Sequence, residues 1–123
     1  MNNRKVYISG EIVPEADAKI SIFDSAVLLG DTVTESTRTF NYKPFKLDDH
    51  LERLYKSFKL TRIDPQMTIE EMKKVSLELL EINKDNYKAN EDCWLVHNIS
   101  RGHSITGGNP ALQVSKPTVM IYT

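Results

Sequence analysis

The segment formed by residues 24–54 constrains the fold of this chain more than any other part of the sequence. Its threonine- and valine-rich run at 33–40 predicts a strand, because β-branched side chains fit a pleated surface. A short return strand at 45–47 and a helix with Asp48 as its N-cap are expected to follow. The apolar positions of that helix recur at helical spacing, so it must cover a sheet.

Local signals outside this segment predict the remaining elements. Ser9 and Gly10 form a two-residue hairpin loop, and Thr68 with Glu71 forms a capping box that begins a second helix. That helix is expected to bury Ile69, Met72, Val75, Leu79 and Ile82, and further strands are expected at 93–100 and 117–123. Adjacent hairpins and two consecutive helices argue against alternating βαβ units. The predicted fold is therefore α+β, a mainly antiparallel sheet with two helices packed on one face as a two-layer sandwich.

Composition limits the class of protein. The chain has 123 residues, which favours a single domain over 1–123, and its 40% hydrophobic and 27% charged content is typical of a globular domain. A net charge of −1 argues against a nucleic-acid partner. The single cysteine, Cys93, excludes an internal disulfide and favours a reducing compartment. Because no apolar run approaches the length of a membrane span, we expect a cytoplasmic protein with no membrane partner.

The strand at 33–40 has two faces, and neither is wholly apolar. One carries Thr34, Ser36, Arg38 and Phe40, and the other carries Val33, Glu35, Thr37 and Thr39. Either one face lines a wet or ligand-filled space, or the strand is an edge strand with a solvated face. Arg38 and Arg53 are candidate anion contacts, because a guanidinium binds phosphate or carboxylate bidentately, but snorkelling surface arginines fit the pattern equally.

Other polar residues give only weak indications of a metal site or a catalytic site. His50, His97 and His103 lack metal-ligand spacing and are expected to be surface or hydrogen-bonded histidines. Glu35 and Asp31 are expected to form a surface pair, with a catalytic carboxylate at Glu35 as the alternative. No phosphate-binding glycine loop or metal-binding motif occurs in the sequence.

Five pieces in series give a more specific indication. They are YISGEIVPEADAKISIFD, LLGDTVTESTRTF, KPFKLDDHLERLYKSFK, EEM and WLVHNISRG. In this order the sequence resembles the small N-terminal domain of the fold-type IV pyridoxal-phosphate enzymes. These include branched-chain and D-amino-acid aminotransferases, R-selective amine transaminases and aminodeoxychorismate lyase.

The resemblance implies roles for several residues. The arginine of the family's HLxRL helix motif binds the cofactor phosphate, and Arg53 occupies that position here. VTESTR is similar to the family's VFEGIR, which places Thr34, Glu35 and Arg38 on the strand that faces the site. Arg38 is then a candidate contact for a substrate carboxylate.

Departures from the family pattern concern the substrate pocket. Leu29 stands where branched-chain enzymes place a tyrosine that reaches the partner subunit's pocket. Trp94 matches a second tyrosine, and Val96 replaces an arginine. These positions are expected to line a different or wider pocket, with His97 or Asn98 as replacement polar contacts.

The family's Schiff-base lysine belongs to a large C-terminal domain that this chain lacks. The resemblance therefore implies a homodimeric parent enzyme that uses pyridoxal 5'-phosphate to exchange an amino group between an amino acid or amine and a 2-oxo acid. This chain alone is expected to be inactive and to bind no cofactor tightly. Its loop at 103–115 resembles the family's mobile loop. The alternative is a stand-alone, non-catalytic interaction or dimerisation domain with the same fold.

Overall fold

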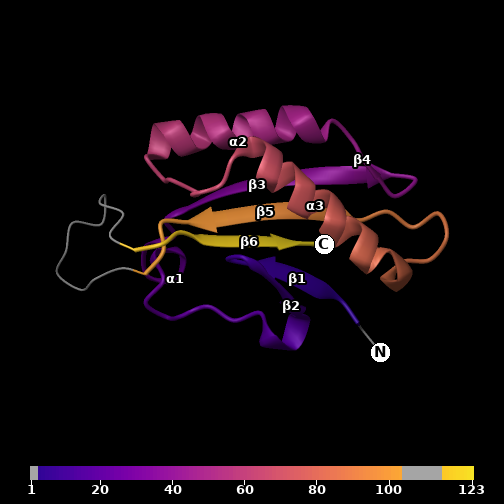
Figure 1. Ribbon diagram of the computed structural model, residues 1–123, viewed down its shortest axis with the longest axis horizontal. Coiled ribbons are helices and arrows are strands. Elements are labelled where there is room, and N and C mark those ends of the chain that lie inside the picture. Colours follow the sequence, from indigo (N-terminus) through magenta and orange to yellow (C-terminus); the bar gives the residue numbers. More distant parts are fainter. Residues whose placement is uncertain (1–2, 104–114) are drawn as a thin grey trace.

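In the computed structural model, which describes residues 3–103 and 115–123, six strands form one sheet in the order β2-β1-β6-β5-β3-β4 (Figure 1). Every neighbouring pair is antiparallel. The strands are β1 (Lys5–Ile8), β2 (Glu11–Pro14), β3 (Thr32–Phe40), β4 (Lys43–Pro44), β5 (Trp94–Ser100) and β6 (Thr118–Tyr122). The helices are α1 (Ser25–Leu29), α2 (Leu47–Thr61) and α3 (Ile69–Asn83), with 3-10 turns at Glu15–Asp17 and Lys84–Asn86.

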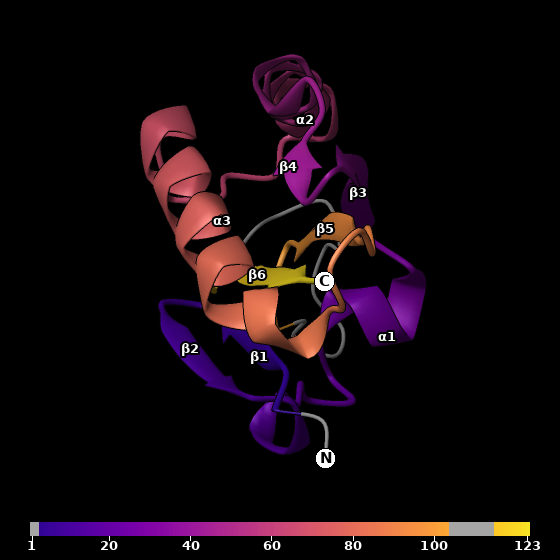
Figure 2. The same ribbon diagram turned by 90° about the vertical axis from the view of Figure 1, so that its right-hand side faces the viewer.

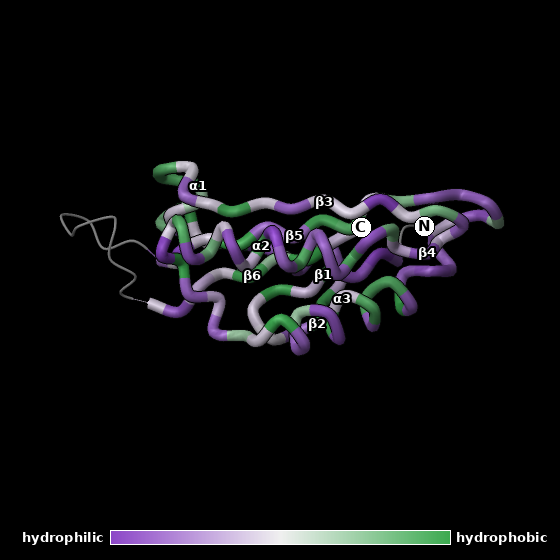
Figure 3. The backbone as a smooth tube through the Cα atoms, turned by 90° about the horizontal axis from the view of Figure 1, so that it is seen from above, coloured by the Kyte–Doolittle hydropathy of each residue, from purple (hydrophilic) through white to green (hydrophobic). Residues whose placement is uncertain are grey.

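Both long helices cover the same side of the sheet, which we call the covered face (Figure 2). The short helix α1 lies on the other side, the open face, and Figure 3 shows α1 and α3 on opposite sides of β5 from above. The predicted α+β architecture, a mainly antiparallel sheet with two helices on one face, is confirmed. Among the described residues, no helix is long and apolar enough to cross a membrane.

The core lies between the covered face and the two long helices. Because side chains alternate along a strand, every second residue of β5 and β6 enters this core. The fully buried side chains of the core include Leu51, Leu54, Met72, Leu79, Leu95, Ile99 and Ile121.

The first hairpin and the start of α3 follow the sequence predictions. Ser9 and Gly10 both have positive φ angles, 43° and 101°, as a two-residue hairpin loop requires. Thr68 and Glu71 form both hydrogen bonds of the capping box. The loop predicted at 103–115 falls outside the described residues over 104–114.

The start of α2 differs from the prediction. The helix begins at Leu47, with Lys46 as the N-cap residue at a φ of 55°, so the predicted Asp48 cap is wrong. Leu47 is buried, and its burial places the first turn two residues earlier. The Asp48 carboxylate instead pairs with Lys73 at 2.8 Å. The return strand is Lys43–Pro44 rather than 45–47.

The buried side of α3 also differs from the prediction. Ser76 and Asn83 are fully buried, whereas Ile82 is 44% exposed. The Asn83 amide accepts a hydrogen bond from the backbone N–H of Lys5 at 2.7 Å and donates one to its carbonyl at 2.9 Å. This pair joins the end of α3 to β1, so Asn83, and not the neighbouring Ile82, is the buried residue at the end of the helix.

A buried carboxylate positions α1. Asp24 caps that helix by accepting from the backbone N–H of Ala26 at 2.9 Å. It also accepts from the hydroxyls of Ser100 at 2.6 Å and Thr118 at 2.5 Å. Asp24 therefore fixes α1, including Leu29 at its end, to the ends of β5 and β6.

Candidate functional site

One carboxylate on β3 receives two side chains from α2. The Nε of Arg53 donates to Oε2 of Glu35 at 2.9 Å, and its Nη2 donates to Oε1. Nδ1 of His50 lies 2.7 Å from the same Oε1. His50 and Arg53 are three residues apart, so they share the side of α2 that faces β3. The structure therefore builds a cluster of Glu35, His50 and Arg53 between strand and helix.

Glu35 is ionised in this cluster. Burial raises the pKa of its carboxyl, but hydrogen bonds from Arg53 and His50 lower it more, so the pKa of Glu35 lies below its ordinary value. The expected surface pair of Glu35 with Asp31 is wrong, because Asp31 pairs instead with Arg101 at 2.8 Å.

The ionised carboxylate fixes the proton on His50. A carboxylate only accepts hydrogen bonds, so Nδ1 of His50 must carry the hydrogen that it donates to Glu35. Nε2 is then the nitrogen of His50 that gains or loses a proton. Among residues 3–103 and 115–123, neither this Nε2 nor Nη1 of Arg53 has a hydrogen-bond partner.

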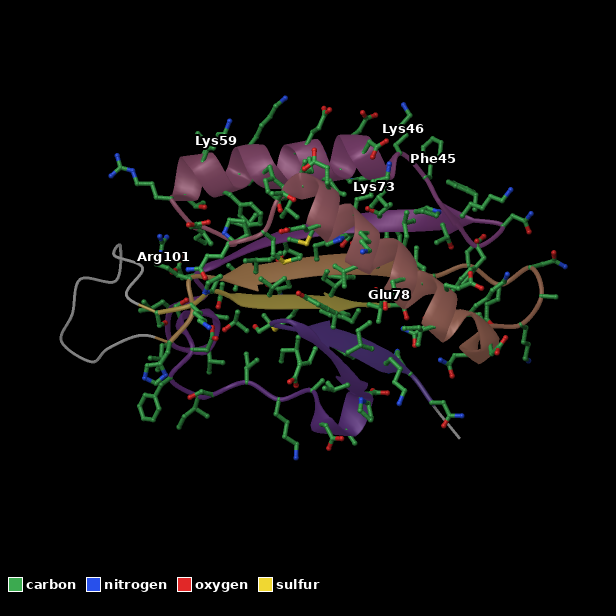
Figure 4. All side chains as sticks on the ribbon, viewed as in Figure 1. Phe45, Lys46, Lys59, Lys73, Glu78 and Arg101 are labelled. Carbon is green, nitrogen blue, oxygen red and sulfur yellow. The ribbon has the colours of Figure 1, made fainter. Side chains whose placement is uncertain are left out.

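Arg53 and Arg101 differ in what their guanidinium groups can bind. Arg101 is buried at the end of β5, beneath the C-terminal end of α2 (Figure 4), where it donates to Asp31 and to the carbonyls of Thr61 and Arg62. The side chain of Arg53 is 68% exposed and has one edge on Glu35. Arg101 therefore fixes the end of a helix, whereas Arg53 presents its outer edge for an anion.

The open face brings together most of the other candidate residues. The pairing of β3 with β5 places Thr34 opposite Asn98 and Arg38 opposite Trp94, with Val96 between them. The guanidinium of Arg38 lies 4.4 Å from the ring centroid of Phe40. Leu29, at the end of α1, is exposed on the same side of the sheet. These residues line a surface that mixes polar, aromatic and cationic groups.

His97 does not lie on that surface. It is fully buried on the covered face, with Nε2 2.7 Å from the hydroxyl oxygen of Ser76. Burial lowers its pKa to about 4, so the imidazole is neutral at physiological pH. Of the two expected polar replacements, only Asn98 lies on the open face.

An apolar groove of about 600 Å³ extends across the open face. Its apolar lining comes mainly from Val6, Ile8, Ile20, Trp94, Val96, Met120 and Tyr122. The candidate substrate residues Trp94 and Val96 therefore belong to both the strand pair β3–β5 and this groove.

Sequence reasoning missed the role of His50. It treated the three histidines alike, although His50 precedes Arg53 by three residues and both face a strand that carries a glutamate. That spacing was the available signal, but it becomes informative only once α2 is known to lie over β3. The described residues contain no group of three or more histidine, cysteine or acidic side chains that could hold a metal ion.

Comparison with known proteins identifies the family. The profile of the amino-transferase class IV family matches residues 32–123. The chain is 39% identical over 115 residues to a putative branched-chain-amino-acid aminotransferase of Methanocaldococcus jannaschii, covering 94% of this chain and 38% of that protein. It is 32% identical over 119 residues to a D-alanine aminotransferase of Staphylococcus epidermidis, covering 97% and 40%.

The fold agrees with this relationship. The crystal structure of a branched-chain aminotransferase from the archaeon Thermoproteus uzoniensis, with norvaline, superposes with a TM-score of 0.75 at 27% identity. That match covers 96% of this chain and 39% of the other. The chain belongs to the class IV aminotransferase family, and it spans about 40% of the length of these relatives.

Proposed function

We propose that this chain is the small N-terminal domain of a pyridoxal-phosphate-dependent aminotransferase, and that Arg53 contacts the cofactor phosphate. Family membership and the limited share of each relative that the chain spans support this proposal. The observation that carries it is the Arg53 guanidinium, which is fixed along one edge by Glu35 and exposed along the other.

The residues present fit the phosphate of that cofactor. A guanidinium that is held in place and exposed is well suited to bind a phosphate, and Arg53 is both. When bound, pyridoxal phosphate supplies the electron sink that amino-group transfer requires. In this proposal Glu35 acts through Arg53, by orienting the guanidinium, rather than by touching substrate.

The open face would provide the substrate contacts. We assign the substrate carboxylate to Arg38, and the wall of the pocket to Thr34, Trp94, Val96 and Leu29. Asn98, opposite Thr34, offers the polar group on this face. The substrates would be an amino acid or amine and a 2-oxo acid. His97, which lies on the covered face, is left out of the site.

Catalysis would require a lysine that this chain does not provide. Two described lysines illustrate the surroundings: Lys43 of β4 is exposed, and Lys73 of α3 pairs with Asp48 of α2 (Figure 4). We therefore propose that the chain alone is inactive, and that the remaining length of its relatives corresponds to the part that carries the lysine. The parent would be a cytoplasmic homodimer.

Binding of pyridoxal 5'-phosphate to the purified chain tests this proposal. We expect weak binding without a stoichiometric lysine label after borohydride reduction, and no transamination. Arg53→Gln should weaken the binding about tenfold, because the charged donor is lost. Arg62→Gln, which removes an exposed arginine at the end of the same helix, is the matched control and should retain wild-type binding.

Two results would contradict the proposal. A single lysine labelled stoichiometrically, or measurable transamination, would show that the chain holds a complete site. An equal loss of affinity for pyridoxal 5'-phosphate in Arg53→Gln and Arg62→Gln would show that binding depends on surface charge alone. If no phosphate compound binds and the chain associates with itself through the open face, the stand-alone interaction domain is the better description.

A further inference from the structure

We propose that His50 is a positioning residue that holds Glu35 so that Arg53 presents its outer edge, and that a proton on His50 raises the affinity of this site for anions. The inference rests on the proposed function of Arg53 as a phosphate contact. It concerns two atoms of His50, Nδ1, which binds Glu35, and Nε2, which takes up the proton.

Glu35 and Arg53 have longer and more flexible side chains than His50. The terminal torsion of a glutamate is broad, so Arg53 alone leaves the plane of the Glu35 carboxylate loosely defined. His50 is shorter and its side chain is only 24% exposed. Its bond of 2.7 Å to Oε1 fixes that oxygen, which also accepts from Nη2 of Arg53. An arginine that is ordered before an anion arrives loses less entropy on binding.

The protonation state of His50 sets the net charge of the cluster. With neutral His50, the charges of Glu35 and Arg53 cancel. A proton on Nε2 adds one positive charge, and it does so beside the guanidinium, because Nδ1 of His50 lies 3.5 Å from Nη2 of Arg53. A dianion should therefore bind more tightly to the protonated cluster.

The other groups around His50 do not change this expectation. Glu35 faces it from β3 and Arg53 from its own helix. His97 of β5 is the third titratable group that interacts with it, and burial lowers the pKa of His97 to about 4. A pH series from 5.5 to 8 spans the range in which histidines ordinarily change charge, so it tests the effect of a proton on Nε2 of His50.

Sulfate binding to the full 123-residue chain separates positioning from protonation, because sulfate keeps its charge over this range. The affinity and the Arg53 Nε–H resonance would be followed by NMR between pH 5.5 and 8. His50→Asn keeps an N–H donor near Nδ1 but cannot take up a proton, whereas His50→Ala removes both. His103→Asn, an exposed histidine outside the cluster, is the matched control.

The wild type and His103→Asn should bind sulfate about three- to tenfold more tightly at pH 5.5 than at pH 8. His50→Asn should match the wild type within about twofold at pH 8 and lose the pH dependence. His50→Ala should bind about tenfold more weakly at pH 8, because Arg53 is no longer preordered. Wild-type affinity in His50→Ala, or a retained pH dependence in His50→Asn, would overturn the inference.

The resonance of Arg53 distinguishes this inference from the proposed function. If the wild type binds no sulfate at any pH, the phosphate contact fails. The Nε–H signal still decides the positioning role: it should be protected from exchange in the wild type and His50→Asn and lost in His50→Ala. Protection in all three proteins would show that His50 does not position Arg53.

Discussion

The two faces of the sheet differ in what their side chains contact. On β5, Leu95, His97 and Ile99 are fully buried on the covered face, whereas Trp94 on the open face is 58% exposed. Both faces carry apolar residues, but the two long helices α2 and α3 cover only the covered face. Apolar content alone therefore does not mark the core of this domain, because apolar side chains such as Trp94 are also exposed on the open face.

Polar groups also differ between the faces. On the covered face they bind specific partners: the hydroxyl of Thr39 donates to Asp92 at 2.9 Å, and the hydroxyl of Tyr42 donates to the carbonyl of Leu80 at 2.7 Å. These bonds tie loops and helices to the sheet. The covered face therefore buries polar groups without leaving most of them unpaired, which a periodicity argument cannot anticipate.

The largest expected difference between the faces comes from truncating two residues of β5. Ile99→Ala should lower the free energy of unfolding by about 2–5 kcal/mol, because it leaves a cavity in the core. Val96→Ala, on the open face of the same strand, should cost less than about 1 kcal/mol. Urea unfolding followed by circular dichroism measures both. Equal costs would mean that the open face is packed as tightly as the core.

The buried His97 on the covered face should make the stability of the domain depend on pH. Burial lowers the pKa of His97 to about 4, below the value of about 6.5 in an unfolded chain. As the pH falls, the unfolded state therefore binds the proton before the folded state does. The stability that the folded state has with neutral His97 is fully present above pH 6.5 and is lost as the pH falls toward 4. The loss should reach roughly 3 kcal/mol in the wild type.

The variant His97→Gln isolates this effect. The difference in unfolding free energy between the wild type and His97→Gln should shrink as the pH falls from 7 to 4, measured by urea unfolding at each pH. His103→Asn, which changes an exposed histidine, should follow the wild-type profile. A constant difference across the range would show that His97 titrates as an exposed residue does.

The smallest expected effect concerns the open face alone. Trp94→Ser should change the free energy of unfolding by no more than about 0.5 kcal/mol, because the ring is exposed. If the open face is a contact surface, the substitution should also reduce self-association in sedimentation experiments. Leu60→Ser, which removes an 86% exposed apolar side chain from α2, is the control and should leave association unchanged.

The sequence predicted the architecture because strong local signals agreed with it. The Ser9–Gly10 loop, the capping box at Thr68 and the alternation of 33–40 each act within a few residues. The predictions for the start of α2 and for the buried side of α3 were wrong. Both features depend on tertiary contacts, the burial of Leu47 and the pairing of Asn83 with Lys5, which local signals do not contain.

The candidate site shows the same division. The motif resemblance singled out Arg53, but Glu35 was expected to pair with Asp31 or to face the site itself. The bond between Glu35 and Arg53 joins residues 18 positions apart, and it exists only because α2 lies over β3. Of the two alternatives for 33–40, the edge strand holds in part, because β4 pairs only with Thr39 and Phe40. A face that lines a ligand-filled space stays a prediction.

The place of β6 in the sheet has a consequence for the order of events during synthesis. This strand is the last element in the described chain, yet it lies between β1 and β5 (Figure 1). The β1–β2 hairpin therefore has no neighbouring strand until residues 118–122 leave the ribosome, although it is made first. Until then the nascent chain holds two separate pieces of sheet with unpaired edges, which is the stage at which a chaperone would have most to protect.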